Sequence, residues 1–185
     1  AFLPILAESK ANQSDEEVQL VINHIATKLL SILMIITLIA IVIAPIIILL
    51  FAWGFYFKAD VTQFQLASDM LRITFPYLLL ISLTALSGSI LNTYDNFIIP
   101  AFTPVLLNIS LILSAVFLSK YLSTPIMALA WGVLFGGIIQ LGFQIPFLRK
   151  IKRLPKLQFG HHKALSILRK RMLPALFGVS VSQIN

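Results

Sequence analysis

Long apolar stretches without charged positions dominate the pattern along the chain. A helix needs about 20 consecutive apolar residues to cross a bilayer, and four stretches reach that length: 29–53, 70–91, 97–118 and 126–148. None alternates apolar and polar residues over about ten positions, as a membrane barrel strand does. The pattern therefore predicts an all-α protein, a polytopic bundle of transmembrane helices.

Shorter apolar runs lie at both ends of the sequence. Residues 1–7, AFLPILA, are typical of the end of an earlier span, and another apolar run begins near Met172 and continues to Asn185. We therefore expect a bundle over 1–148, a linker over 149–171 and the start of a further span over 172–185. On this pattern the chain is expected to be an interior piece of a longer membrane protein.

Turn and cap residues set the expected helix boundaries. The sequence SDEE at 14–17 is a capping box, which predicts a helix that starts near residue 15, well before its lipid-embedded part. Thr124 and Pro125 predict an N-cap followed by proline at the first helical position, and Pro100 is expected to open the 97–118 helix in the same way. The expected connections are 54–69, 92–96 and 119–125.

Proline and glycine are expected to interrupt the spans. Pro45, Pro76, Pro104 and Pro146 lie within or near the apolar runs. Gly132 and Gly136 form a small-xxx-small pair that lets two helices approach closely. Such breaks serve ordinary packing, and they also occur in the bent helices that surround transporter cavities.

Composition supports a membrane protein and restricts the partners. The chain is 58% hydrophobic and 11% charged, which leaves a soluble fold of 185 residues too little polar surface. Its net charge of +7 is local. The window 149–171 holds nine of the 14 Lys and Arg residues and no acid. Because that window lies beside hydrophobic spans, nucleic acid is not expected as a partner.

The basic residues also predict the topology. Consecutive spans alternate in direction, so 8–17, 92–96 and 149–171 share one side of the membrane. That side carries eleven Lys and Arg residues, including Lys10 and Lys28, against three (Lys58, Arg72 and Lys120) on the other. The positive-inside rule then places 149–171 in the cytoplasm.

Two interpretations of the basic window stay open at this level. The charge sets topology, or it also gathers an anionic lipid at the membrane surface. Leu165, Leu168 and Met172 form an apolar stripe that predicts an amphipathic helix over 161–171 in the headgroup layer. The membrane-surface basic residues of this interpretation are Arg149, Lys150, Lys152, Arg153, Lys156, Lys163, Arg169, Lys170 and Arg171.

A few polar residues inside or beside the spans are candidates for a substrate cavity. Such residues need partners across a helix interface or in a wet cavity, and interhelical hydrogen bonding competes with the cavity interpretation for each of them. Asp69 and Arg72 lie three residues apart on one helix face, where they are expected to pair unless Arg72 faces an anion. The cavity candidates are Arg72, Asn108, Gln140, Gln144 and Gln183.

No catalytic or metal-binding constellation is predicted. The acids Asp60, Asp69 and Asp95 lie at three different places in the sequence, and the chain has neither a zinc-protease motif nor a phosphate-binding loop. Adjacent His161 and His162 point apart on a helix, so they are not expected to hold a metal. We therefore expect no enzyme activity and no cofactor.

Several segments resemble one known family of membrane transporters. The block ITFPYLLLISLTALSGSILNTYDNFIIPAFTPVLLNIS at 73–110 is similar to the lipid II flippases of the MurJ (MviN) family. So are AFLPILAE at the start, ALAWGVLFGGIIQLGFQIPFLRKI at 128–151 and PALFGVSVSQIN at the end. The resemblance covers nearly the whole chain in the expected order, and the 73–110 block is its most specific part.

The resemblance implies a place in a larger fold and an activity. The family belongs to an exporter superfamily (MOP) with about fourteen spans in two lobes, so the chain would cover the end of the second span to the start of the seventh, most of the N-terminal lobe. The implied cargo is lipid II, an undecaprenyl-pyrophosphate-linked peptidoglycan precursor, which alternating access moves between leaflets of the bacterial inner membrane. The implied partners are membrane lipids and the remaining first spans and C-terminal lobe.

The resemblance leaves two other functions open. One is export of another polyprenol-linked glycan within the same superfamily, and the other is a non-transporting membrane scaffold. The family's essential cavity arginines lie mainly in segments that this sequence does not include, so none of them is assigned to a residue here.

Overall fold

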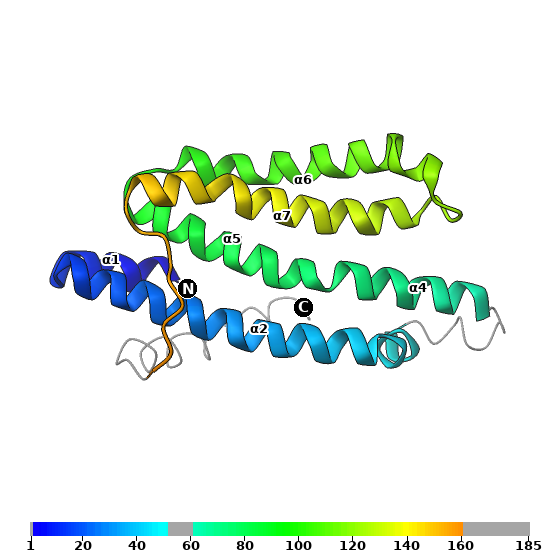
Figure 1. Ribbon diagram of the computed structural model, residues 1–185, viewed down its shortest axis with the longest axis horizontal. Helices are drawn as coiled ribbons and strands as arrows, with labels where there is room; N and C mark the ends of the chain where they lie inside the picture. Colours follow the sequence, from blue (N-terminus) through cyan, green and yellow to red (C-terminus); the bar gives the residue numbers. More distant parts are fainter. Residues whose placement is uncertain (1, 52–60, 161–185) are drawn as a thin grey trace, which may run out of the picture. The chain divides into compact units, whose positions relative to one another are not determined.

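A computed structural model describes residues 2–51 and 61–160, and every regular element among them is helical. Figure 1 shows the elements in chain order. They are α1 (Phe2–Asn12), α2 (Asp15–Phe51), α4 (Val61–Thr74), α5 (Pro76–Thr93), α6 (Ile98–Val116), the 3₁₀ helix η1 (Leu118–Tyr121) and α7 (Met127–Lys150).

Four helical stretches of the described chain are long and apolar enough to cross a membrane. They are Asp15–Phe51, Thr62–Thr93, Ile98–Tyr121 and Met127–Lys150. Each one contains most of a predicted span, so the all-α membrane bundle is confirmed and the chain is a membrane protein.

The chain divides into two compact units. The described residues of unit 1 are 2–30, 85–100 and 144–160, and those of unit 2 are 31–51, 61–84 and 101–143. Several long helices therefore contribute one part to each unit.

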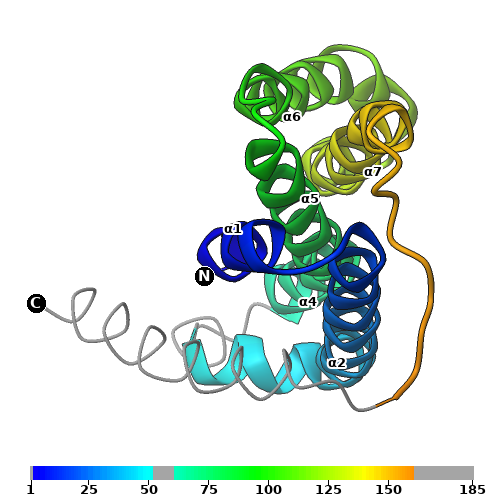
Figure 2. The same ribbon diagram turned by 90° about the vertical axis from the view of Figure 1, so that its left-hand side faces the viewer.

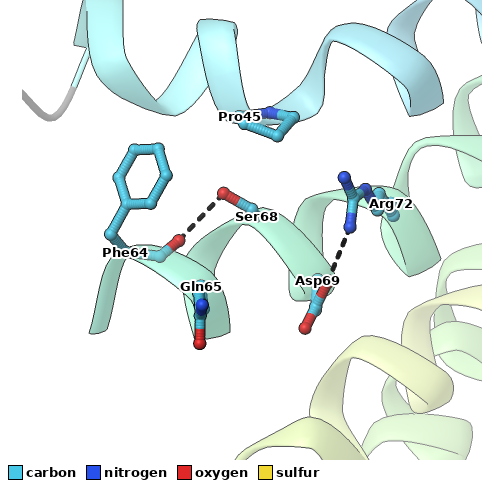
Figure 3. Close-up of a pocket in the computed structure, with 6 residues that line it drawn as sticks. All are labelled: Pro45, Phe64, Gln65, Ser68, Asp69 and Arg72. Carbon is cyan, nitrogen blue, oxygen red and sulfur yellow. Dashed lines mark hydrogen bonds and ion pairs between the residues drawn. The ribbon is translucent and has the colours of Figure 1, made fainter. Parts of the chain in front are cut away.

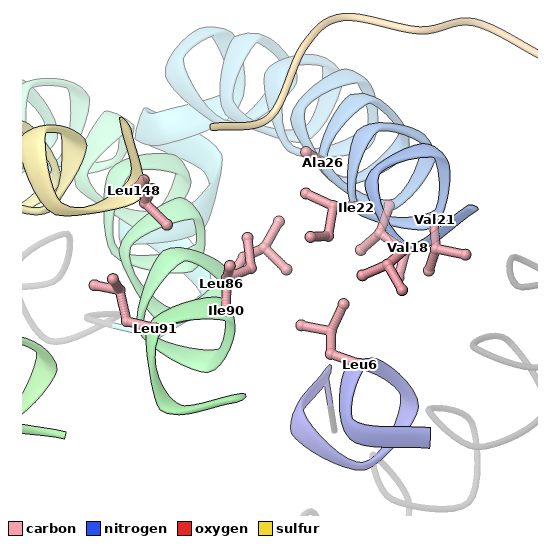
Figure 4. Close-up of a cluster of buried hydrophobic side chains, with 10 residues drawn as sticks. Leu6, Val18, Val21, Ile22, Ala26, Leu86, Ile90, Leu91 and Leu148 are labelled. Carbon is pink, nitrogen blue, oxygen red and sulfur yellow. The ribbon is translucent and has the colours of Figure 1, made fainter. Parts of the chain in front are cut away.

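Unit 1 has an apolar core where α1, α2, α5 and α7 meet (Figure 4). Leu6 of α1 lies against the first turns of α2, and Leu148 of α7 lies on the α5 side of the cluster. The α2 and α5 members, all nearly inaccessible to solvent, are Val18, Val21, Ile22, Ile25, Ala26, Leu86, Ile90 and Leu91. Burying each large aliphatic side chain contributes about 1.5–3 kcal/mol where the surroundings are aqueous.

The capping box fixes the start of α2 as predicted. The Ser14 backbone N–H donates to Glu17 Oε2 at 3.0 Å, and the Glu17 N–H donates to Ser14 Oγ at 3.4 Å. The two residues thus satisfy backbone groups that the first turn of a helix leaves without partners.

In unit 2, α6 and α7 run side by side because small residues line their contact (Figure 1). A Cβ added at Gly132 would lie 2.9 Å from Ser114 Cβ, and one added at Gly136 would lie 2.6 Å from Leu107 Cδ1. The Ser110 hydroxyl donates to the Gly132 carbonyl at 2.8 Å. The predicted small-xxx-small pair is confirmed, and its function is close packing.

Proline breaks only one of the described helices. A turn at Phe75 separates α4 from α5, and Pro76 opens α5. Pro45, Pro104 and Pro146 lie inside helices and do not end their spans, although the last part of α2, drawn in cyan, changes direction (Figure 2). Pro104 lies in the second turn of its helix, and membrane helices tolerate internal proline because neighbouring groups satisfy the freed carbonyl.

Several predicted boundaries also need correction. Residues 61–69, predicted as part of a connection, belong to α4, because a helix continues past the apolar run that marks its lipid-embedded part. Residues 119–121 of the expected 119–125 connection belong to η1, which begins at Leu118. The residues at the start belong to α1, which continues to Asn12, and their place at the end of an earlier span stays a prediction.

The two proline starts are displaced by two residues each. α6 begins at Ile98, which makes Pro100 its third residue, and a helix accepts proline throughout its first turn because those N–H groups have no intrahelical acceptor. α7 begins at Met127, after a turn in which the Met127 N–H donates to the Thr124 carbonyl at 3.0 Å.

Candidate functional site

A polar cavity of about 320 Å³ lies in unit 2 between α4 and the second half of α2 (Figure 3). Pro45 contributes the α2 side, and the rest of the lining comes from one face of α4: Phe64, Gln65, Ser68, Asp69 and Arg72. The α4 residues recur at spacings of three and four, which places them on one face of a helix. The cavity candidate Arg72 therefore lines a hollow of the protein.

Arg72 pairs with Asp69, as the sequence predicts. Arg72 Nη1 lies 3.0 Å from Asp69 Oδ1, and the two side chains are 43% and 55% exposed. An exposed pair of this kind contributes about 0–1 kcal/mol. A guanidinium has five N–H donors, so an anion that enters the cavity can bind Arg72 in competition with Asp69 at low cost.

Gln140 and Gln144 are buried, with 2% and 1% exposure. In unit 2, Gln140 Nε2 donates to the Thr103 carbonyl at 2.9 Å, which is an interhelical bond from α7 to α6. In unit 1, Gln144 lies against the α5 backbone, since its Nε2 would be 3.8 Å from a Cβ added at Gly88. The Oε1 atom of each glutamine has no partner among the described residues, which is rare for a buried polar atom.

The remaining cavity candidates lie elsewhere. Asn108 is exposed on α6, and neither Asn108 nor Gln140 lines the Arg72 cavity. Gln183 lies outside the described residues. The structure therefore does not gather the candidate set into one hollow among the residues it describes.

The basic residues up to 160 occupy two kinds of position. Arg149 and Lys150 end α7 with exposed side chains, and Lys152 and Lys156 are also exposed. Arg153 differs, because its side chain is only 10% exposed, is paired with Asp15 and lies 5.3 Å from the Tyr94 ring centroid. Lys163, Arg169, Lys170 and Arg171, the predicted amphipathic helix and His161–His162 lie outside the described residues.

The sequence did not reveal a second polar cluster in unit 1. Lys10 Nζ donates to the Thr93 carbonyl at 2.7 Å, lies 3.8 Å from Asp95 Oδ2 and sits 4.7 Å from the Tyr94 ring centroid. Together with Arg153 it places two cations around one aromatic ring, an arrangement that cation–π attraction favours. No local signal predicts contacts between residues more than 80 positions apart in the chain.

A third polar feature lies on α2, and its regular spacing in the sequence could have predicted it. Asp15, Gln19, Asn23 and Thr27 of α2 recur every four residues, so they form one face of the helix, which we call the polar stripe. All four contact residues 153–158.

Comparison with known proteins gives a consistent result. The family model for the lipid II flippase MurJ matches residues 1–185. A probable lipid II flippase MurJ of Haemophilus influenzae is 39% identical and one of Vibrio cholerae 41% identical, each over 191 aligned residues. A lipid II flippase MurJ of Burkholderia cenocepacia is 38% identical. All three alignments cover 100% of this chain.

The same alignments cover 38%, 36% and 36% of the Haemophilus, Burkholderia and Vibrio proteins, so the chain spans less than two fifths of each relative's length. The resemblance of the 73–110 block is thus confirmed over the full chain, and it agrees with four helices long enough to cross a bilayer. The chain belongs to the lipid II flippase MurJ family.

Proposed function

We propose that this chain forms most of the N-terminal lobe of a flippase that moves lipid II from the inner to the outer leaflet of the bacterial cytoplasmic membrane. The observation that carries the proposal is the family match over all 185 residues. The four helices long and apolar enough to cross a membrane support it, because a flippase needs such spans.

Alternating access is the proposed mechanism. Two lobes rock about a shared site, so that the site opens to one side of the membrane at a time. A pyrophosphate is costly to move through hydrocarbon unless cations accompany it. Within the described residues, Arg72 is a candidate cation for this purpose, because it lines a cavity and is held by a single exposed carboxylate.

The proposed orientation follows the cation count. Residues 149–171 face the cytoplasm, and 119–125 face the opposite side. Asn108, Gln140, Gln144 and Gln183 stay proposals as cavity residues. The unpaired Oε1 atoms of Gln140 and Gln144 support a need for further hydrogen-bond donors, which cargo or water would supply.

Depletion of the host's own flippase followed by rescue tests the function. The full-length gene is expected to restore lipid II to the outer leaflet, and residues 1–185 alone are expected to fail, because alternating access needs two moving bodies. If the full-length gene fails while an unrelated glycan-lipid pathway depends on it, the cargo assignment is wrong. Rescue by residues 1–185 alone would contradict the two-lobe mechanism.

A further inference from the structure

A segment with no helical structure follows α7 and lies along α2. Residues 151–159, which we call the strap, leave the end of α7 and pass beside the first turns of α2 (Figure 2). The strap and residues 15–30 of α2 both belong to unit 1. A polar backbone in such a position needs hydrogen-bond partners, because it has no helix or sheet of its own.

The polar stripe supplies those partners. Gln19 Nε2 donates to the Leu154 carbonyl at 3.0 Å, and Asn23 Oδ1 accepts from the Lys156 N–H at 2.8 Å. Thr27 Oγ1 accepts from the Gln158 N–H at 2.8 Å. The three bonds pair every fourth residue of α2 with every second residue of the strap.

This pairing has a geometric reason. Four residues of an α-helix advance about 6 Å, and two residues of an extended chain advance about 6.6 Å. The two periods match closely enough for bonds to repeat over the length of the polar stripe. Leu157 and Phe159, which make none of these three bonds, are 69% and 80% exposed.

Further contacts hold the two ends of the strap. At its start, Arg153 Nη1 donates to the Asp15 carbonyl at 2.7 Å and its Nη2 pairs with the Asp15 carboxylate. Ile151 and Leu154 pack against the core of unit 1. Near its other end, Asn23 Nδ2 donates to Gln158 Oε1 at 3.1 Å.

Asn23 is the centre of this arrangement. Its Oδ1 accepts from both Lys156 N–H and Gln19 Nε2, at 2.8 and 2.9 Å, while its Nδ2 holds Gln158. One side chain thus binds the strap twice and orients the neighbouring stripe residue. Only the side chains of asparagine and the longer glutamine carry an amide group with two N–H donors and an accepting oxygen.

We propose that the polar stripe is a permanent anchor that fixes the segment after α7 to α2, with Asn23 as its main positioning residue. This rests on the proposed function, in which the segment continues toward a second lobe. A force on the chain beyond the strap is then transmitted to α2 near Thr27 and does not reach the end of α7 at Lys150. Movement of one lobe is in this way transmitted to α2.

Spin labels at Leu20→Cys and Leu157→Cys test the anchoring directly. The 185 residues contain no cysteine, and any cysteine elsewhere in the full-length protein is replaced by serine. The distribution of distances between the two labels gives the ratio of molecules with the strap bound to α2 to molecules with it released. Asn23→Leu is expected to lower this ratio about tenfold or more, because it removes three hydrogen bonds. Thr27→Val, which removes one bond to the strap and the bond from the Thr27 hydroxyl to the Asn23 carbonyl, is a milder second variant. Glu16→Gln on the exposed face of α2 is the control. An unchanged distance distribution in both variants would overturn the anchor.

The rescue assay described above, with membrane levels matched, tests the functional part. Asn23→Leu is expected to reduce lipid II flipping about tenfold, and Glu16→Gln to leave it unchanged. If a variant with a detached strap flips lipid II at the full rate, the proposal that the strap transmits lobe movement to α2 is wrong. If the unmodified gene does not rescue, the proposed function is wrong, while the label distances still decide whether the strap is anchored.

A disulfide distinguishes an anchor from a latch that must open. The Gln158 N–H lies 2.8 Å from Thr27 Oγ1, which brings the two residues within the roughly 7 Å between Cα atoms that a disulfide spans. The pair Thr27→Cys and Gln158→Cys, oxidised, is expected to keep the flipping activity of its reduced form. Loss of flipping on oxidation, with recovery on reduction, would show that the strap must leave α2 and would overturn the permanent anchor.

Discussion

Lys152 adopts a backbone conformation that costs free energy at the end of α7. Its φ of 56° lies in the left-handed region. The Lys152 N–H donates to the Arg149 carbonyl at 3.0 Å and the Arg153 N–H to the Leu148 carbonyl at 2.9 Å, which is the Schellman pattern that glycine usually completes. Asp95 ends α5 in the same way, with φ of 62°.

Lys152→Gly is therefore expected to stabilise the protein by about 0.5–1 kcal/mol, because glycine adopts this conformation without a Cβ clash. Thermal unfolding of the purified protein in detergent measures the change. Lys150→Gly is the matched control, since Lys150 is the last residue of α7 and has a negative φ, so glycine there is not expected to stabilise the protein. Equal losses of stability in both variants would contradict the strain at Lys152.

Arg72 is expected to matter for flipping through its charge. Arg72→Gln keeps polarity at the cavity but removes the cation, so lipid II in the outer leaflet should fall several-fold in the rescue assay. Asp69→Asn removes the competing carboxylate and is expected to keep or raise flipping, because the pair is exposed and stabilises little. A loss in Asp69→Asn equal to that in Arg72→Gln would indicate that the ion pair itself is what the protein needs.

At the scale of helices, the contact of α6 with α7 depends on the missing side chain of Gly132. Gly132→Ala would place a Cβ 2.9 Å from both Ser114 Cβ and Oγ and 3.4 Å from Leu111 Cα. Because Ser114 Cβ is close to its backbone, the helices themselves must separate, with an expected cost of about 1–3 kcal/mol. Gly142→Ala is the control. A Cβ there meets nothing within 4 Å, so the free energy of unfolding should be unchanged or slightly higher.

The helices were the most predictable part of the fold. Apolar runs give the lipid-embedded length of a span directly, and the capping box gave the start of α2. The runs did not give the polar continuation of α4 over 61–69, because hydropathy measures burial in lipid and not helix length. The ion pair of Arg153 with Asp15 joins residues 138 positions apart, so it follows only from the tertiary fold. The ion pair of Asp69 with Arg72 was predictable, because the two residues lie three positions apart on one helix.

For the whole molecule, the topology is the decisive prediction. α7 has 24 residues and is therefore about 36 Å long, which exceeds the hydrocarbon core of about 30 Å. Its two ends are expected on opposite sides of the membrane. Tyr121, before α7, and Leu157, after it, are both well exposed.

Tyr121→Cys and Leu157→Cys, in the cysteine-free protein, test this with a thiol reagent that does not cross the membrane. Tyr121→Cys is expected to react in intact cells, and Leu157→Cys only after the membrane is opened. Both substitutions leave every Lys and Arg in place, so the charge that sets the orientation is unchanged. If Leu157→Cys alone is labelled in intact cells, the topology is the reverse of the predicted one, and residues 149–171 do not face the cytoplasm.

The anchoring of the strap also has a consequence for sequence evolution. Three of the four stripe residues bind main-chain atoms of the strap, which every amino acid except proline provides in full. Strap positions such as Lys156 and Leu157 are thus free to drift, whereas each stripe residue needs a side chain of one length and polarity. A library that randomises both segments and selects for growth is expected to recover diverse residues at positions 156 and 157 on a nearly invariant stripe, whereas Arg153 and Gln158, whose side chains contact the stripe, should vary less.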